Sequence, residues 1–142
     1  EKLIKALLWN KTELVISLLK TKVDTSYETI TGATAFHIAA ERSSPKVLKA
    51  LLKYGFDINH ISKKGVTPLQ IALFIQNNEN SRVLLIEGAK TEKFCIKRRC
   101  ANSAFSFLKQ FDKALTEAKF SSIVENLQTD NITNKAIQGI NP

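Results

Sequence analysis

Residues 31–40 read TGATAFHIAA, and residues 64–73 repeat the same pattern as KGVTPLQIAL. Three residue types recur at a constant offset of 33 positions, in the pairs Gly32 and Gly65, Thr34 and Thr67, and Ala39 and Ala72. The same offset separates Gly55 from Gly88 and Asp24 from Asp57. A fixed period of this size predicts an array of stacked helix pairs, in which each repeat buries its apolar face against its neighbours.

The two stretches carry a family signature, and on it the chain resembles an ankyrin-repeat protein. The signature G-x-T-P-L-H-x-A-A reads G-A-T-A-F-H-I-A-A from Gly32 and G-V-T-P-L-Q-I-A-L from Gly65, each followed by an apolar run and a glycine. The resemblance implies an all-α solenoid of stacked helix-turn-helix units with short finger turns. We expect a repeat domain over residues 1–127, with repeats at about 1–30, 31–63, 64–100 and 101–127, the first and last divergent. Residues 128–142 are polar and are expected to form a tail or linker.

Local signals set the expected helix ends. Thr34 can cap a helix over residues 35–42, because its hydroxyl can accept from free amides of the first turn. Pro45 suits the first turn of the next helix, and Gly55 suits its end. We expect the first helix of the third repeat over residues 68–76 and the helices of the fourth over 104–111 and 113–126. The residues expected to be buried in that last repeat are Phe105, Leu108, Phe111, Leu115, Phe120, Ile123, Val124 and Leu127.

The composition bounds the class of protein. A chain of 142 residues with 44% hydrophobic and 24% charged residues is typical of one folded domain. No apolar run approaches the roughly 20 residues needed to cross a bilayer. The sequence starts at Glu1 without a secretory signal and without Met, so we expect a piece of a longer protein. Two cysteines make no disulfide scaffold, and a reducing compartment is the default expectation.

The net charge of +8 suggests what kinds of partner the chain could bind. Such a charge favours acidic proteins, nucleic acids or anionic membrane surfaces, without separating them. The lysines are spread through every repeat, and no aromatic ladder alternates with them as stacking on single strands would require. We therefore expect a partner protein, with an acidic surface as one option and nucleic acid as the less favoured alternative, and a monomeric domain.

The residue inventory does not favour catalysis. The sequence has no G-x-S-x-G, no phosphate-cradling glycine loop and no cluster of metal ligands. His37 is interpreted as structural, since the resemblance implies that it bonds the backbone of the adjoining turn. Cys95 and Cys100 lack the further ligands that zinc needs, and we interpret them as a buried finger residue and a packing residue just before a helix. We therefore expect no enzyme activity, no metal and no cofactor.

Two stretches invite a functional interpretation. Residues 90–100 (KTEKFCIKRRC) hold five basic residues, one acidic residue and two interleaved apolar ones, which suggests either a protruding basic finger for a partner or a solvated loop packed on the repeats. Leu51, Asp57 and Ile58 precede Asn59 in the order that resembles the site of the oxygen-dependent asparaginyl hydroxylase in ankyrin repeats. The simpler alternative is that Asn59 stabilises its turn through side-chain to backbone bonds.

The resemblance implies a protein-interaction module, or scaffold, that binds through finger turns and the first helices. The predicted partner-binding residues are Tyr27, Glu28, Glu41, Arg42, Asn59, His60, Ser62, Lys63, Lys64, Phe94, Lys97, Arg98 and Arg99. An alternative is that the chain is the ankyrin portion of a larger effector or enzyme. We expect a cytoplasmic location, with the nucleus, or a host cell entered by an intracellular microbe's effector, as alternatives.

Overall fold

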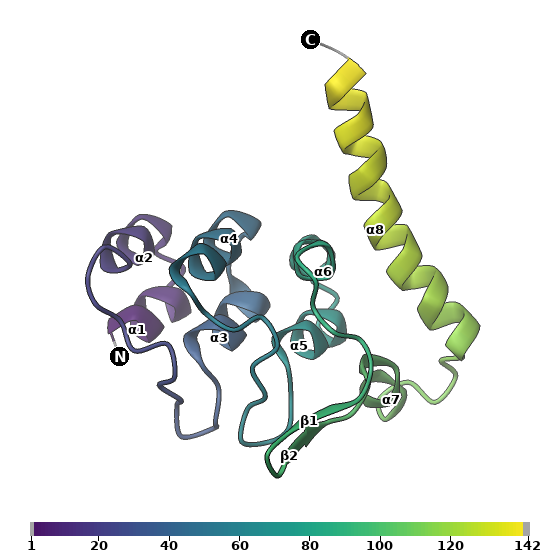
Figure 1. Cartoon of the computed structure of the whole chain (residues 1–142), viewed down its shortest axis with the longest axis horizontal. Helices are drawn as coiled ribbons and strands as arrows, with labels where there is room; N and C mark the ends of the chain where they lie inside the picture. Colours follow the sequence, from purple (N-terminus) through teal and green to yellow (C-terminus); the bar gives the residue numbers. More distant parts are fainter. Residues whose placement is uncertain (1, 141–142) are drawn as a thin grey trace.

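The computed structural model describes the backbone of residues 2–140 and the side chains of residues 2–129. Two rows of helices run side by side (Figure 1). The first row contains α1 (Lys2–Leu8), α3 (Ala35–Arg42), α5 (Pro68–Phe74) and α7 (Ala104–Lys109). The second row contains α2 (Thr12–Leu18), α4 (Pro45–Tyr54), α6 (Asn78–Ile86) and α8 (Glu117–Ile140). Each helix packs on its neighbour in the same row, so the four helix pairs stack as repeats.

The repeated motif forms helix starts by the same hydrogen bonds in two repeats. The Thr34 hydroxyl accepts from the amide of His37 at 3.4 Å, and the Thr67 hydroxyl accepts from the amide of Gln70 at 3.3 Å. In turn, the His37 side chain accepts from the amide of Thr34, and the Gln70 side chain accepts from the amide of Thr67. These reciprocal capping boxes satisfy amides that the first helical turn leaves free. The predicted helix over residues 35–42 is confirmed, and α5 ends two residues before the predicted boundary.

Buried apolar side chains join the repeats into a continuous core. Phe36, Leu48 and Leu69 are fully buried in successive elements of this core. Pro45 is the first residue of α4, and Gly55 follows its last residue at φ 126°, a conformation that other residues rarely adopt. Both predictions for this helix are therefore confirmed. Among the described residues, no helix is long and apolar enough to span a membrane.

The fourth repeat departs from the expected boundaries. α7 ends at Lys109 and α8 begins at Glu117, later than the expected residue 113, so a longer turn joins them. Phe111 lies in this turn and is 59% exposed, and Ile123 is 37% exposed, so the prediction that both are buried is wrong. Leu115, Phe120 and Leu127 are buried as expected. The backbone of α8 continues to Ile140, through most of the segment expected as a polar tail, and residues 141–142 lie outside the described part.

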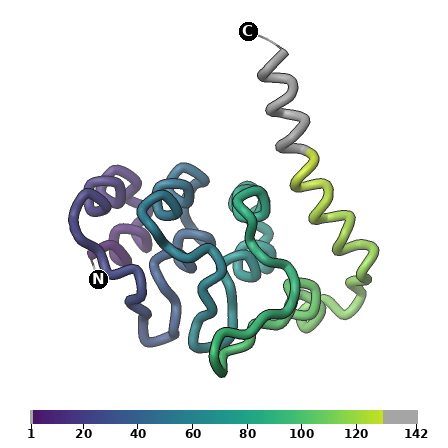
Figure 2. The backbone as a smooth tube through the Cα atoms, viewed as in Figure 1, coloured from purple at the N-terminus to yellow at the C-terminus, as the bar shows by residue number. Residues whose placement is uncertain are grey.

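Three loops leave the helix pairs on the same side of the stack (Figure 2). The first spans residues 24–32, the second spans residues 57–65, and the third contains β1 (Phe94–Ile96) and β2 (Arg99–Ala101). The two strands pair antiparallel, with Cys95 opposite Cys100, so the third loop is a β-hairpin rather than a plain turn. We call these segments the first finger, the second finger and the hairpin, and together the finger edge.

Candidate interaction surface

Two first-row helices, α3 and α5, hold the second finger and the hairpin in place through equivalent hydrogen bonds. The His37 Nε2 lies 2.9 Å from the carbonyl oxygen of Val66, and Gln70 Nε2 donates to the carbonyl of Asn102. Val66 follows the second finger, and Asn102 follows the hairpin. The second and third repeats therefore each anchor the loop that follows them, and His37 has the expected structural role.

His37 fills this role as a neutral imidazole. Its Nδ1 accepts from the amide of Thr34 at 3.3 Å, which leaves Nε2 to carry the proton given to Val66. Burial lowers the pKa of His37 from 6.5 to about 4, aided by the nearby His60 ring and opposed by the bond to Val66. The centroids of the two imidazole rings are 5.7 Å apart, in an edge-to-face arrangement. A group held neutral and fully bonded inside the stack is poorly suited to transfer protons.

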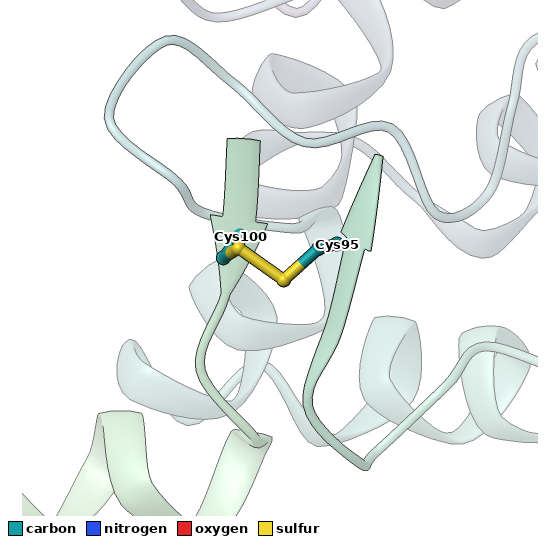
Figure 3. Close-up of a disulfide and its surroundings, with 2 residues drawn as sticks. All are labelled: Cys95 and Cys100. Carbon is teal, nitrogen blue, oxygen red and sulfur yellow. A yellow bond between two sulfur atoms is a disulfide. The ribbon is translucent and has the colours of Figure 1, made fainter. Parts of the chain in front are cut away.

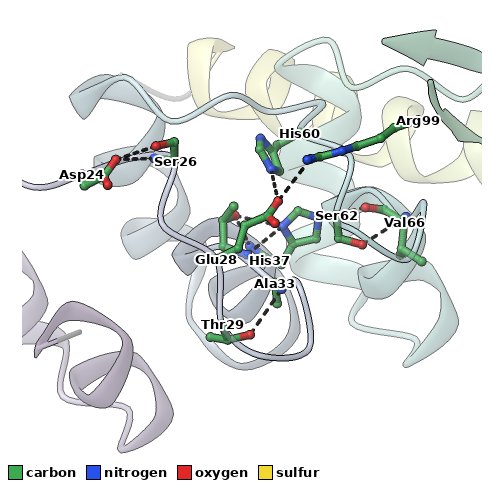
Figure 4. A network of polar contacts seen from close by, with 11 residues as sticks. Asp24, Ser26, Glu28, Thr29, Ala33, His37, His60, Ser62, Val66 and Arg99 are labelled. Carbon is green, nitrogen blue, oxygen red and sulfur yellow. Dashed lines mark hydrogen bonds and ion pairs between the residues drawn. The ribbon is translucent and has the colours of Figure 1, made fainter. Parts of the chain in front are cut away.

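A carboxylate connects all three fingers. The Glu28 Oε1 of the first finger lies 2.8 Å from His60 Nε2 of the second finger and 3.6 Å from Arg99 Nη1 of the hairpin (Figure 4). The Glu28 side chain is only 9% exposed, whereas that of Arg99 is 52% exposed. Because a charged group with little solvent depends on its partners, Glu28 ties three loops that lie far apart in sequence. We call this set the Glu28 bridge.

The first two fingers share a further local device. Asp24 accepts from the amide of Ser26 at 2.9 Å, and Asp57, one period later, accepts from the amide of Asn59 at 2.9 Å. The Ser26 hydroxyl also donates to Asp24, and these bonds lower the pKa of that carboxyl. Such side-chain turns fix loop backbone that would otherwise have only water as a partner. The finger edge is therefore built from ordered turns.

Gly32 and Gly65 let neighbouring fingers approach closely. A Cβ atom on Gly32, at φ 85°, would lie 2.7 Å from the Cβ of Lys63 in the second finger. On Gly65, at φ 78°, it would lie 2.9 Å from the carbonyl oxygen of Cys100 in the hairpin. Glycine is needed at both places for its positive φ and for its missing side chain.

The hairpin is closed by a disulfide between Cys95 and Cys100 (Figure 3). Both cysteines are exposed, and their sulfurs bond each other across the two strands. The interpretations of Cys95 as a buried finger residue and of Cys100 as a packing residue are therefore wrong, because β1 and β2 pair with the two side chains facing each other. Among the described residues, no group of three or more His, Cys, Asp or Glu side chains is placed to hold a metal.

The comparisons with known proteins agree with this architecture. The family model of ankyrin repeats, in three copies, matches residues 3–95. The chain belongs to the ankyrin-repeat family. The part beyond residue 95, including β2 and the fourth helix pair, lies outside this match but continues the same stacking.

Three similar proteins illustrate how widely these ankyrin repeats are used. An ADP-ribosylation factor GTPase-activating protein, AGD2 of Arabidopsis thaliana, is 37% identical over 59 residues, which are 42% of this chain and 8% of that protein. The putative ankyrin repeat protein FPV244 of fowlpox virus is 33% identical over 83 residues, 57% of this chain and 12% of that protein. The protein phosphatase 1 regulatory subunit 12A of Mus musculus is 39% identical over 54 residues, 38% of this chain and 5% of that protein. The chain thus corresponds to a small share of each relative's length.

The predicted partner-binding residues of this ankyrin chain fall into four groups. Those with exposed side chains at the finger edge are Tyr27, Lys63, Lys64, Lys97, Arg98 and Arg99. Glu28, Asn59, His60 and Phe94 are half-buried there. Ser62 is buried and its hydroxyl accepts from the Val66 amide, so it belongs to the turn rather than to the exposed surface. Glu41 and Arg42 are exposed at the far end of α3, roughly 10 Å of helix from the fingers.

Asn59 has a structural partner. Its Oδ1 accepts from the amide of Lys90 at 2.9 Å, and this bond links the second finger to the base of the hairpin. The bond is of the side-chain to backbone kind that the simpler alternative expected, but it joins the next loop rather than the turn of Asn59 itself. Its hydroxylation stays a prediction, which intact mass after treatment with the asparaginyl hydroxylase would test. A chain that gains no oxygen would contradict it.

Sequence reasoning missed the Glu28 bridge, although Glu28 and His60 were both predicted as surface residues. They are 32 positions apart, close to the repeat period, and that spacing is the only available signal. It also missed Asn80, which is fully buried and donates from Nδ2 to the carbonyls of Ala40 and Ser43. Asn80 thereby holds the end of α3 from the neighbouring repeat. A buried asparagine inside a helical pattern looks the same in sequence as an exposed one.

Proposed function

We propose that this chain is a non-enzymatic module that binds a partner protein through its finger edge. The observation that carries the proposal is a row of exposed side chains, Tyr27 and five basic residues, on three loops that are bonded to one another. Each loop has at least one such side chain: Tyr27 on the first finger, Lys64 on the second finger and Arg98 on the hairpin. Ordered loops lose little conformational freedom on binding, which favours affinity. Aromatic and arginine side chains are the types that most often dominate binding energy.

The proposed partner has an acidic surface. The exposed charges of the finger edge are mainly basic, and Glu28 is already paired with His60 and Arg99. A complementary acidic patch would be steered toward this edge and would bind faster at low salt. We include Glu41 and Arg42 only as peripheral contacts, because they lie at the other end of α3.

The experiment is a pull-down from nuclease-treated lysate at low and raised salt, with bound proteins identified by mass spectrometry. The test variant combines Lys64→Glu, Lys97→Glu and Arg98→Glu, which leaves the Glu28 bridge intact. The matched control combines Lys46→Glu, Lys49→Glu and Lys53→Glu, three exposed lysines of α4. A protein held by the wild type and the control but lost by the test variant supports the proposal. Equal losses in both variants would contradict it, because they would show only an effect of net charge.

Nucleic-acid binding is the second candidate, favoured by the same basic residues. Phosphate contacts would make the affinity fall steeply with salt. Phe94 is half-buried with the Lys90 ammonium 5.1 Å from its ring centroid, so it offers no free platform for a base. Binding that disappears after nuclease treatment would favour this candidate over the first.

A larger protein is the third possibility. The relatives named for GTPase-activating or phosphatase-regulating roles share only a small part of their length with this chain. An ankyrin portion of such a protein would bring a separate catalytic part to the partner. A gene that encodes little beyond these 142 residues would contradict this idea.

A further inference from the structure

A groove lies between the second finger and the hairpin. It has a volume of about 600 Å³ and is lined by Asp57, His60, Ile61, Ile96, Lys97, Arg98 and Arg99. This volume is within the range of pockets that hold ligands or partner side chains. The groove is formed by two loops of successive repeats, so its shape depends on how those loops are held together.

Three contacts fix the walls of the groove. Glu28 bonds His60 on one wall and lies 3.6 Å from Arg99 on the other. The carbonyl of Cys100 packs against Gly65, where any side chain would be too close. The Cys95–Cys100 disulfide ties the two strands of the hairpin next to the groove. The groove therefore exists before a partner arrives, which lowers the entropic cost of binding.

The lining combines an apolar part with a basic rim. Both isoleucines line the groove, where Ile61 is buried and Ile96 is 49% exposed. Neither Lys97 nor Arg98 takes part in an ion pair within the described residues. The one carboxylate of the lining, Asp57, is already bonded to the Asn59 amide. A ligand in the groove would therefore contact aliphatic surface next to Lys97 and Arg98, two cationic side chains without an ion-pair partner among the described residues.

We propose that this groove binds an acidic peptide segment of the partner protein, with one large apolar side chain seated between Ile61 and Ile96. Asp or Glu residues on either side of that apolar side chain pair with Lys97 and Arg98. This proposal rests on the proposed function and adds the chemistry of the ligand and its place on the finger edge. The aliphatic lining disfavours a nucleic-acid strand, which would need flat aromatic surfaces for its bases.

The test selects peptides from a random twelve-residue library displayed on phage against the whole chain, without reductant. The expected winners carry a large apolar residue flanked by Asp or Glu. Fluorescence anisotropy then compares the labelled winning peptide on three variants. Ile96→Ser and Arg98→Glu are each expected to weaken binding by about tenfold, the loss typical of a central contact. Lys49→Glu on α4 is the charge-matched control for Arg98→Glu and is expected to change nothing beyond the effect of net charge.

The outcomes separate this proposal from the proposed function. Winning peptides without acidic residues, or an unchanged affinity in Ile96→Ser, would overturn the groove. The same is true if no peptide is enriched. If Tyr27→Ala and Lys64→Glu abolish peptide binding while Ile96→Ser and Arg98→Glu do not, the peptide binds elsewhere on the finger edge and not in the groove. Competition by a single-stranded oligonucleotide at raised salt would assign the basic rim to nucleic acid instead.

Discussion

The imidazole Nε2 of His60 lies 2.8 Å from the carboxylate Oε1 of Glu28, and this contact joins the first two fingers of the stack. Helix packing aligns the repeats, but the loops extend beyond the helices and need contacts of their own. Glu28 supplies one by facing both the next finger and Arg99 of the hairpin (Figure 4). The Glu28 carboxylate therefore adds a contact that spans all three loops to the bonds that hold each loop separately.

A double-mutant cycle should detect the contact between Glu28 and His60. Glu28→Ala, His60→Ala and the double variant are expected to give a coupling energy of about 1 kcal/mol, as for a hydrogen-bonded pair with limited solvent. Urea denaturation of the four proteins measures it. Glu125, exposed on α8, supplies a control cycle with His60 that is expected to be additive. Additivity between Glu28 and His60 would contradict the bridge.

Stability should fall with acidification because of His37. Its pKa is lowered from 6.5 to about 4 in the folded chain, mainly by burial, so the unfolded chain binds the proton more tightly. The contribution of neutral His37 to the free energy of unfolding is fully present above pH 6.5. It falls by roughly 3 kcal/mol as the pH drops from 6.5 through 4. Urea denaturation between pH 7 and pH 4 measures this loss.

The variant His37→Gln is the control for that pH effect. Gln70 already fills the equivalent position with the same capping bonds, so glutamine should preserve the fold. The difference in stability between wild type and variant should then change with pH by the same roughly 3 kcal/mol. Parallel pH profiles for the two proteins would show that His37 does not titrate as described.

Reduction of the disulfide should loosen the hairpin. A two-stranded hairpin is marginal alone, and a cross-link that closes so small a loop is worth about 2 kcal/mol in the chain-entropy account. A reductant should lower stability by that order and speed amide exchange in residues 94–101. The Cys95→Ser, Cys100→Ser double variant should not respond to reductant. A wild type that is equally unresponsive would mean that the hairpin does not depend on the bond.

Alanine substitutions at Gly65 and Gly88 should separate the cost of backbone strain from the cost of disturbed packing between fingers. Gly65 and Gly88 both have positive φ, but only Gly65 has the next finger within reach of a Cβ atom. Gly88→Ala should cost about 1 kcal/mol, from left-handed backbone alone. Gly65→Ala should cost at least about 1 kcal/mol more, because the Cys100 carbonyl must also move. Equal costs, measured by urea denaturation, would show that the hairpin yields without penalty.

Much of the fold follows from local sequence, and the parts that do not have a physical reason. Thr34 and His37 cap the start of α3, and Pro45 and Gly55 mark the two ends of α4. These signals lie within one repeat, so a single sequence is enough to predict them. Cys95 and Cys100 meet only because β1 and β2 pair in the register that places them opposite each other, and their spacing alone does not fix that register. Phe111 depends on where α7 stops, which the tertiary packing decides. The Glu28 bridge joins three repeats, so no single repeat contains its signal.

The most direct test of the account is hydrogen–deuterium exchange on the whole chain, with and without the partner protein captured by the pull-down. Binding is expected to slow amide exchange in the first finger, the second finger and the hairpin, over residues 24–32, 57–65 and 94–101. Exchange in α4 and α6 should stay unchanged, because these helices lie in the second row, away from the finger edge (Figure 1). Protection confined to α4 and α6, with no change at the fingers, would contradict the account.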